Sequence, residues 1–424
     1  MAELSAGDTA WLLMATALVM VMLPGLALFY GGLVRRKNVL STIMHSFFGL
    51  ALVSVVWVVV GFSLAFGPDV NGAGLIGSLD FVGFSNVGLE PNPAYAAGIP
   101  FVLFASFQLM FAAITPALIT GAFAERKRFG AFVMFTVLWS VLVYSPLAHW
   151  VWAPGGWLRE LGALDFAGGT VVHVSSGVSA LVAAVLIGRR WSLGDGNRME
   201  PHDVPMTVLG AGLLWFGWFG FNAGSALGAN GLAANALLVT NTAAGAATLA
   251  WVLASYAHRR KVSVVGAAAG AVAGLVAITP ASGYVTAGGA VLIGLAAGGV
   301  CYSATLLRER LRIDDALDVF AVHGVGGMFG AVATGVLAVS AIGGVSGAIE
   351  GNLGQVGVQV VAVGAAALFA GGATFVIVKG IEFVLGLRVE PQQEELGLDL
   401  AVHGEAKVRG MRARVLGVRG SGLG

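Results

Sequence analysis

The sequence predicts an all-α membrane protein with eleven transmembrane helices, arranged as two inverted five-helix repeats (spans 1–5 and 6–10) and a peripheral eleventh helix. Composition gives the first reason: 57% of the 424 residues are hydrophobic and only 11% are charged, whereas about 25% are charged in soluble domains. A soluble protein of this size cannot hide that much apolar surface from water. The composition therefore excludes a soluble enzyme, a disordered scaffold and a nucleic-acid-binding protein.

Uninterrupted apolar runs give the number of spans. Each run is long enough for a membrane helix, which needs about 20 apolar residues. Two long runs break internally, at the polar, Gly-rich stretch 222–235 and at 279–283, so each of these forms two helices and the total is eleven. The nine runs are 9–34, 38–68, 91–124, 129–158, 166–188, 204–258, 262–307, 319–349 and 351–378.

Basic residues predict the orientation of the chain. Lys and Arg cluster after the odd-numbered spans, while the opposite loops contain only Arg159. By the positive-inside rule the N-terminus is outside and the C-terminus is cytoplasmic. We therefore expect a transmembrane transport domain over 1–386, in a cell membrane, and a cytoplasmic regulatory tail over 387–424. The basic clusters are 35–37, 126–128, 189–190, 259–261 and 308–312.

Two histidines occupy matching places in the two repeats. Asp165 precedes His173 by eight residues, and Asp315 precedes His323 by eight residues, five spans later. Eight helical residues rise about 12 Å, close to half of the about 30 Å hydrocarbon thickness. Because spans 5 and 10 enter from opposite faces, we expect the two imidazoles to meet near the middle of the membrane. Ionisable groups at that depth indicate a functional site.

The histidine pair is also compatible with a packing role and with a metal site. The two rings could simply pack and satisfy each other, or they could bind a metal in a membrane enzyme. A catalytic zinc usually has three protein ligands, and no carboxylate lies within one turn of either His. The single Cys301 excludes a cysteine cluster, and no phosphate-binding GxxxxGK[ST] motif supports an ATP-driven pump. We expect no metal, no cofactor and no enzymatic activity.

Around His173 and His323 the sequence strongly resembles the ammonium transporter (Amt/Mep/Rh) family, in its bacterial and archaeal Amt-like branch. The most specific match is DFAGGTVVHVSSG over 165–177. Further matches are FYGGL at 29–33, FQ at 107–108 with Phe111, GAFAER at 121–126, WFGFNAGS at 218–225, VHGV at 322–325, GLR at 386–388 and HGE at 403–405. The resemblance extends from span 1 into the tail.

The resemblance implies a channel-like transporter for nitrogen uptake that carries ammonium or ammonia. It implies a homotrimer in the lipid of the cell (inner) membrane, with one path through each subunit. In bacterial members a PII-type signalling protein blocks the cytoplasmic face, so we expect the tail to be regulatory. The tail combines an acidic stretch, 390–399, with a basic one, 407–419.

The resemblance also assigns the site. The outer ammonium-binding site falls on Trp152, Ser225 and Phe111, with Asp165 beneath it. The rings of Phe111 and Phe221 form the pore gate, and His173 and His323 line the pore. Structural roles stay open for several of them: Trp152 as an interfacial anchor, the Phe residues as packing, and Asp165 as the N-cap of span 5.

We hypothesise that ammonium loses a proton at this site and that ammonia then passes the two histidines. Potassium cannot lose a proton, so an apolar pore would reject it. Transport could be electrogenic or neutral. One alternative is an Rh-like channel for a neutral gas, although that subgroup typically lacks the Trp/Ser pair. Another is an ammonium sensor with little flux, although such proteins usually carry an appended signalling domain that a short tail cannot supply.

Overall fold

The computed structural model describes residues 3–193 and 200–405, which fold into helices and loops without strands. Ten of these helices are long and apolar enough to span a membrane, and α11 is a shorter apolar helix. The expected eleven spans and all-α fold are therefore confirmed. In order, the spans are α1 (Ala6–Leu33); α2 (Val39–Val56) with η2 (Trp57–Gly61) and α3 (Phe62–Phe66); α4 (Phe101–Ile119) with η4 (Thr120–Phe123); α5 (Phe129–Trp139) with η5 (Ser140–Tyr144) and α6 (Ser145–Trp152); η6 (Gly169–Val174) with α8 (Ser175–Ile187); α9 (Val204–Gly224); α10 (Gly231–Arg259); α11 (Val264–Ile278); α12 (Ala287–Arg310); η8 (Phe320–Gly324) with α13 (Val325–Leu337); and α15 (Gly354–Leu385).

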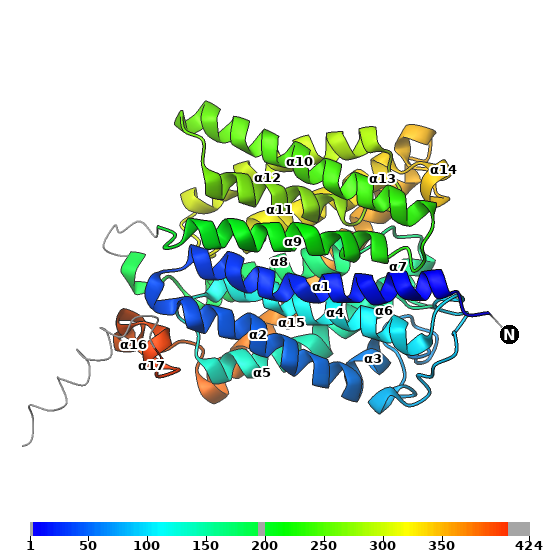
Figure 1. Ribbon diagram of the computed structural model, residues 1–424. Coiled ribbons are helices and arrows are strands. Elements are labelled where there is room, and N and C mark those ends of the chain that lie inside the picture. Colours follow the sequence, from blue (N-terminus) through cyan, green and yellow to red (C-terminus); the bar gives the residue numbers. More distant parts are fainter. Residues whose placement is uncertain (1–2, 194–199, 406–424) are drawn as a thin grey trace, which may run out of the picture.

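Short helices lie at the two ends of the bundle. The N-terminus, α7 and α14 are at one end, and α16 and α17 are at the other (Figure 1). We name the first the outer end and the second the inner end, following the orientation expected from the basic residues. The short helices are η1 (Arg36–Asn38), η3 (Val82–Phe84), α7 (Trp157–Glu160), η7 (Trp191–Leu193), α14 (Ser340–Gly343), η9 (Ala348–Glu350), α16 (Pro391–Leu396) and α17 (Leu398–Ala401).

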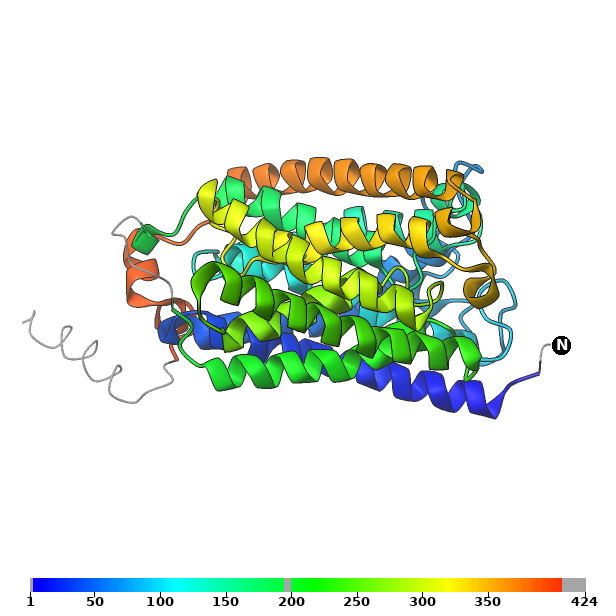
Figure 2. The ribbon, with the colours of Figure 1, turned by 90° about the horizontal axis from the view of Figure 1, so that it is seen from above.

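Polar side chains set the starts of several spans. The first amides of a helix lack intrahelical partners, and a Ser, Thr, Asp or Asn at the N-cap supplies one. The break expected at 222–235 lies between α9 and α10, where Asn230 caps the new helix. The break expected at 279–283 lies between α11 and α12, where Thr286 does the same. The eleventh span, α15, packs along one side of the bundle (Figure 2).

The two repeats meet where α8 crosses η8 and where α13 crosses η6. A Cβ atom added to Gly177 would lie 2.1 Å from the backbone nitrogen of Gly324. One added to Gly327 would lie 2.9 Å from Cβ of His173 and 3.0 Å from the carbonyl oxygen of Gly169. Each glycine follows its own histidine by four residues and packs against the backbone beside the other one. This reciprocal contact is the signature of an inverted repeat, and only glycine fits it.

We predict that Gly177→Ala destabilises the fold, because the new methyl group meets backbone atoms that cannot move aside. Overpacking of this kind costs about 1–3 kcal/mol. Gly364→Ala, in α15, is the matched control because nothing lies within 4 Å of its added Cβ. The fraction of detergent-solubilised protein that stays monodisperse after heating measures the effect. Equal thermal loss in the two variants would contradict a tight crossing at Gly177.

Candidate functional site

A vestibule of about 170 Å³ opens at the outer end. Aromatic rings form most of its wall, with few polar groups among them. Aromatic faces attract small cations, while Arg159 brings one positive charge into the same wall. The vestibule is lined by Phe66, Tyr95, Phe104, Gln108, Phe111, Trp152, Arg159, Phe166, Ser225 and Leu227.

Three residues expected to bind the substrate, Trp152, Phe111 and Ser225, line this one vestibule. The ring centroids of Phe111 and Trp152 are 5.9 Å apart with nearly perpendicular planes. The indole Nε1 of Trp152 donates to the carbonyl oxygen of Asp165 at 2.9 Å. The hydroxyl of Ser225 donates to the carbonyl oxygen of Phe221 at 2.8 Å, so its lone pairs remain available to accept from an N–H donor.

The rings of Phe111 and Phe221 close the floor of the vestibule. Their centroids are 4.2 Å apart with planes tilted by 34°, and each side chain is only 1% exposed. One ring comes from α4 and the other from α9. The contact leaves no room between them, so a molecule passes only when at least one ring rotates.

Below these rings lies an apolar lumen of about 10 Å³, close to the space that one water molecule needs. His173 and His323 bring imidazole nitrogens into it, and their Nδ1 atoms are 3.3 Å apart. The contact expected from the sequence is thus present. The lumen is lined by Met22, Leu26, Phe29, Ile114, Leu118, Val172, His173, Leu214, Trp218, Phe221, Val272 and His323.

The contact between the histidines fixes which polar groups face the lumen. A neutral imidazole has one N–H and one acceptor nitrogen. When one Nδ1 donates to the other, the donating ring keeps an acceptor at Nε2, and the accepting ring carries its hydrogen at Nε2. Nε2 of His173 is buried and makes no hydrogen bond within the described residues. The neutral pair therefore offers the lumen one donor and one acceptor.

Asp165 lies behind this path rather than in its wall. Its Oδ1 accepts from the amides of Gly168 and Gly169 at 2.8 and 2.6 Å, and its Oδ2 accepts from those of Thr170 and Val171 at 2.8 and 3.1 Å. Both carboxylate oxygens thus cap η6, the turn that carries His173. Asp165 reaches the vestibule through its backbone carbonyl, which holds Trp152.

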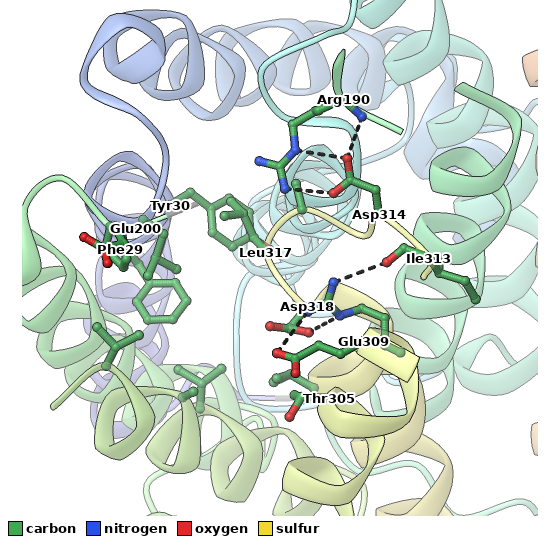
Figure 3. A pocket seen from close by; sticks show the side chains of 18 of the residues that line it. Phe29, Tyr30, Arg190, Glu200, Thr305, Glu309, Ile313, Asp314, Leu317 and Asp318 are labelled. Carbon is green, nitrogen blue, oxygen red and sulfur yellow. Dashed lines mark hydrogen bonds and ion pairs between the residues drawn. The ribbon is translucent and has the colours of Figure 1, made fainter. Parts of the chain in front are cut away.

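At the inner end a funnel of about 980 Å³ leads to His323. Charged pairs surround its mouth, as Figure 3 shows for Arg190 with Asp314. The guanidinium of Arg190 makes two bonds to that carboxylate, at 3.0 and 2.8 Å, and a third to Glu125 at 2.7 Å. All three residues are buried. Because the funnel is wide and polar, hydrated ions can approach His323 from this side.

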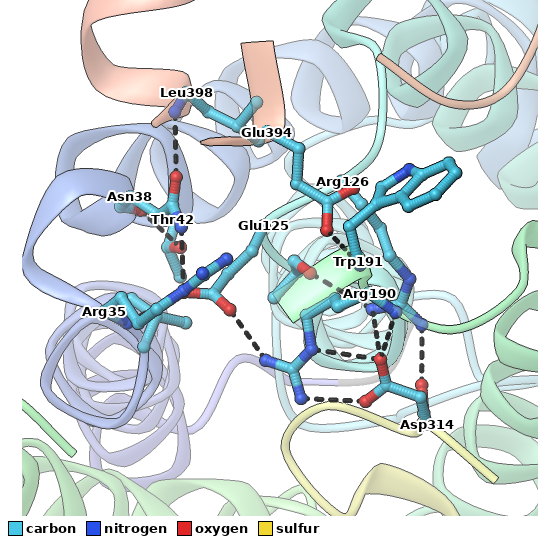
Figure 4. Close-up of polar contacts among 12 residues, drawn as sticks. Arg35, Asn38, Thr42, Glu125, Arg126, Arg190, Trp191, Asp314, Glu394 and Leu398 are labelled. Carbon is cyan, nitrogen blue, oxygen red and sulfur yellow. Dashed lines mark hydrogen bonds and ion pairs between the residues drawn. The ribbon is translucent and has the colours of Figure 1, made fainter. Parts of the chain in front are cut away.

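The tail joins the same ionic network (Figure 4). Asn38 donates from Nδ2 to Glu125 at 2.8 Å, and its Oδ1 accepts from the amide of Leu398 in α17 at 2.8 Å. Glu394 in α16 accepts from the amide of Trp191 and pairs with Arg388. This network was not among the expected site residues, because the sequence shows the arginines of the inner end as a topology signal and does not reveal their partners.

The chain matches the family model "Ammonium Transporter Family" over residues 10–408. It is 49% identical to an ammonium transporter of Bacillus subtilis over 94% of this chain and 98% of that protein, and 46% identical to ammonium transporter Amt1 of Archaeoglobus fulgidus over 95% and 99%.

Solved structures show the same fold. Mep2 of Saccharomyces cerevisiae superposes with a TM-score of 0.86 at 38% identity, covering 92% of this chain and 89% of that one. A structure described as a sensor Amt protein superposes with a TM-score of 0.87 at 34% identity, covering 93% and 98%. With a family match over nearly its whole length and close relatives of nearly equal length, the chain belongs to the ammonium transporter family.

Proposed function

We propose that this chain transports ammonium by binding it in the outer vestibule, removing a proton and passing ammonia through the lumen between the two repeats. Family membership supports ammonium transport. The observation that carries the mechanism is the contact of His173 with His323 in an apolar lumen of about 10 Å³. A hydrated cation does not fit there, whereas one small neutral molecule does.

Recruitment rests on Trp152, Phe111 and Ser225. The aromatic faces attract a cation with about 0.5–2 kcal/mol each, and the Ser225 oxygen accepts one N–H. Asp165 supports this site through its carbonyl and holds η6 in place. Phe111 and Phe221 then act as the gate, because their contact separates the vestibule from the lumen.

Selectivity follows from the cost of dehydration. A bare cation in an apolar pore loses far more hydration energy than a few ring contacts return. Ammonium avoids this cost by giving up a proton to water in the vestibule, and potassium has none to give. The proton either returns to the outer solution, which makes transport neutral, or crosses separately, which makes it electrogenic. The neutral histidine pair then offers ammonia one hydrogen-bond donor and one acceptor along its way.

A sensor with little flux is the second candidate, favoured by the likeness to the sensor Amt structure. A binding protein would keep the vestibule and the histidines and still pass nothing. Ammonium-evoked current in proteoliposomes on a solid-supported membrane separates the two functions. Without current, a pH dye inside the vesicles distinguishes a neutral ammonia channel, which makes the interior alkaline, from a sensor, which does not.

Orientation, oligomeric state and partner remain proposals. An external N-terminus and a cytoplasmic tail are supported by the basic residues at the inner end. The homotrimer and the PII-type partner rest on the resemblance. Cross-linking in native membranes tests the trimer, and co-purification with a PII protein tests the partner. The basic part of the tail, 407–419, lies outside the described residues.

We predict that the double variant His173→Leu/His323→Leu loses the ammonium-evoked current or lets potassium produce one, because the lumen then lacks its polar groups. The currents that ammonium, potassium and methylammonium evoke in the double variant and in wild type are compared on the same solid-supported membrane. His258→Leu is the control, since His258 bonds the hydroxyl of Tyr302 and lines neither vestibule nor lumen. Wild-type current and wild-type potassium exclusion in the double variant would exclude a role for the pair.

We predict that Trp152→Leu raises the half-saturating ammonium concentration by about 2–30-fold, the equivalent of the 0.5–2 kcal/mol of a cation–π contact. Trp152→Phe retains a ring and shows a smaller rise. Trp157→Leu is the control for an interfacial aromatic anchor, because Trp157 lies outside the vestibule lining. The half-saturating concentration comes from current titrations, and equal values for Trp152→Leu and wild type would remove Trp152 from the binding site.

We predict that Glu125 makes tail docking sensitive to acid. Burial alone would raise the pKa of Glu125, but Arg190 and Arg35 outweigh it and hold that pKa at about 2. The folded-state pKa is depressed, so this stabilisation is present above the unfolded-state value of about 4.3 and is lost as the pH falls toward about 2. The hydrogen-exchange protection factors of 391–401, which correct for the intrinsic pH dependence of exchange, should therefore fall across this window.

Glu125→Gln should accelerate the same exchange at neutral pH, because removing one partner of a buried ion pair costs about 3–5 kcal/mol. The control is Glu309→Gln. Glu309 is about half exposed, and its pair with Arg259 spans 3.7 Å, so we expect little change. Slow exchange of the tail in Glu125→Gln would show that the network does not hold α16 and α17.

A further inference from the structure

His149 lies fully buried near the outer end of α6, one helical turn before Trp152. Its Nδ1 is 3.0 Å from the carbonyl oxygen of Ala65, near the end of α3. Its Nε2 is 3.0 Å from Oδ1 of Asp69, in the loop that follows. The imidazole thus connects span 4 to the outer end of span 2.

Both neighbours of this ring are hydrogen-bond acceptors. A neutral imidazole has only one N–H and satisfies one of them, whereas the imidazolium donates to both. The Asp69 carboxylate is only 10% exposed, so the contact to Nε2 is largely shielded from water. Buried ion pairs persist where the geometry satisfies both partners, and loss of either partner is costly. Both nitrogens of the ring therefore have a polar partner here, at a place where the fold could have used apolar packing.

The pair connects two walls of the vestibule. Phe66 lies between Ala65 and Asp69 in the chain and lines the vestibule, and its carbonyl oxygen accepts from the hydroxyl of Tyr95, which also lines it. Trp152 lies on α6, three residues after His149, and lines the same vestibule. Movement of the ring would shift Phe66 and Tyr95 relative to Trp152.

The rest of the outer loop, residues 67–78, is tied to α6 and to α7 (Trp157–Glu160). Trp150, next to His149 in α6, donates from Nε1 to the carbonyl oxygen of Leu75 at 2.8 Å. The amide of Trp157 donates to the carbonyl oxygen of Gly74 at 3.2 Å. Hydrogen bonds from Gly77 to Leu64 and from Ser63 to Ser78 also hold this loop to the end of α3. His149 adds the contact to the Asp69 carboxylate, the point where the imidazole of α6 reaches the loop.

We propose that His149 and Asp69 are positioning residues for ammonium recruitment, joined in a buried strut that sets the separation of Phe66 and Tyr95 from Trp152. This inference rests on the proposed transport function. Neither residue touches the substrate. Their effect is on how well the vestibule wall fits the cation, and therefore on half-saturation rather than on the maximal rate.

The test compares three variants by ammonium-evoked current in proteoliposomes. Asp69→Ala removes one acceptor. His149→Gln has one amide that donates to only one of the two acceptors. Asp69→Asn restores a full set of bonds, because its amide donates to Nε2 of a neutral ring that still donates from Nδ1 to Ala65. His258→Gln, at the inner end, is the control for a His substitution in a hydrogen-bonded pair.

We expect Asp69→Ala and His149→Gln to raise the half-saturating ammonium concentration about fivefold or more, with maximal current within about twofold of wild type. Asp69→Asn and the control should stay within about twofold in both respects. An unchanged half-saturation in Asp69→Ala overturns the proposal. So does a loss of maximal current and protein yield without a shift in half-saturation, which is the result of a merely structural role.

Hydrogen exchange of residues 63–78 tests the strut without transport. It should accelerate in Asp69→Ala and His149→Gln and remain slow in Asp69→Asn. If wild-type protein gives neither a current nor alkalinisation of the vesicle interior, the transport function fails while this readout still decides the strut. If exchange is unchanged in Asp69→Ala, the strut is absent and the transport function stands.

Discussion

The close crossing of two helix starts is the constraint on which the path depends. Gly177 and Gly327 let α8 and α13 approach until each meets the backbone beside the other repeat's histidine. A side chain at either position would push the two turns apart and separate the imidazoles. The rest of the site follows from this contact, because the lumen is the narrow space left beside it.

Helix starts inside the bundle have a cost that the structure must offset. The first amides of η6 and η8 lie among apolar side chains, where unsatisfied N–H groups are expensive. Asp165 accepts four amides at the start of η6, and Asp315 accepts the amide of Phe320 at 2.7 Å. The two carboxylates thus hold the turns that carry the histidines. Asp165 also holds Trp152 through its backbone carbonyl, so one residue supports both the turn and the vestibule wall.

The sequence determines the number of spans because apolar length, Gly-rich breaks and basic loops are local signals. It also predicts the meeting of His173 and His323, since equal spacing from two aspartates translates into equal depth. It does not predict the Phe111–Phe221 contact, because Phe at helical spacing usually packs in a core; the family resemblance supplied it. Nor does it pair Arg190 with Asp314, because ion pairs between distant loops have no periodicity.

The two ends of the path differ although the repeats match. Three residues after each capping aspartate the backbone takes a positive φ, at Gly168 in one repeat and Asp318 in the other. Gly168, at the outer end, has no side chain and lies beneath the small aromatic vestibule. Asp318, at the inner end, has a carboxylate that lies 2.6 Å from Arg308, in the wide charged funnel. In the transport that we propose, a symmetric scaffold with unlike ends takes up ammonium where space is scarce and releases ammonia where water is plentiful.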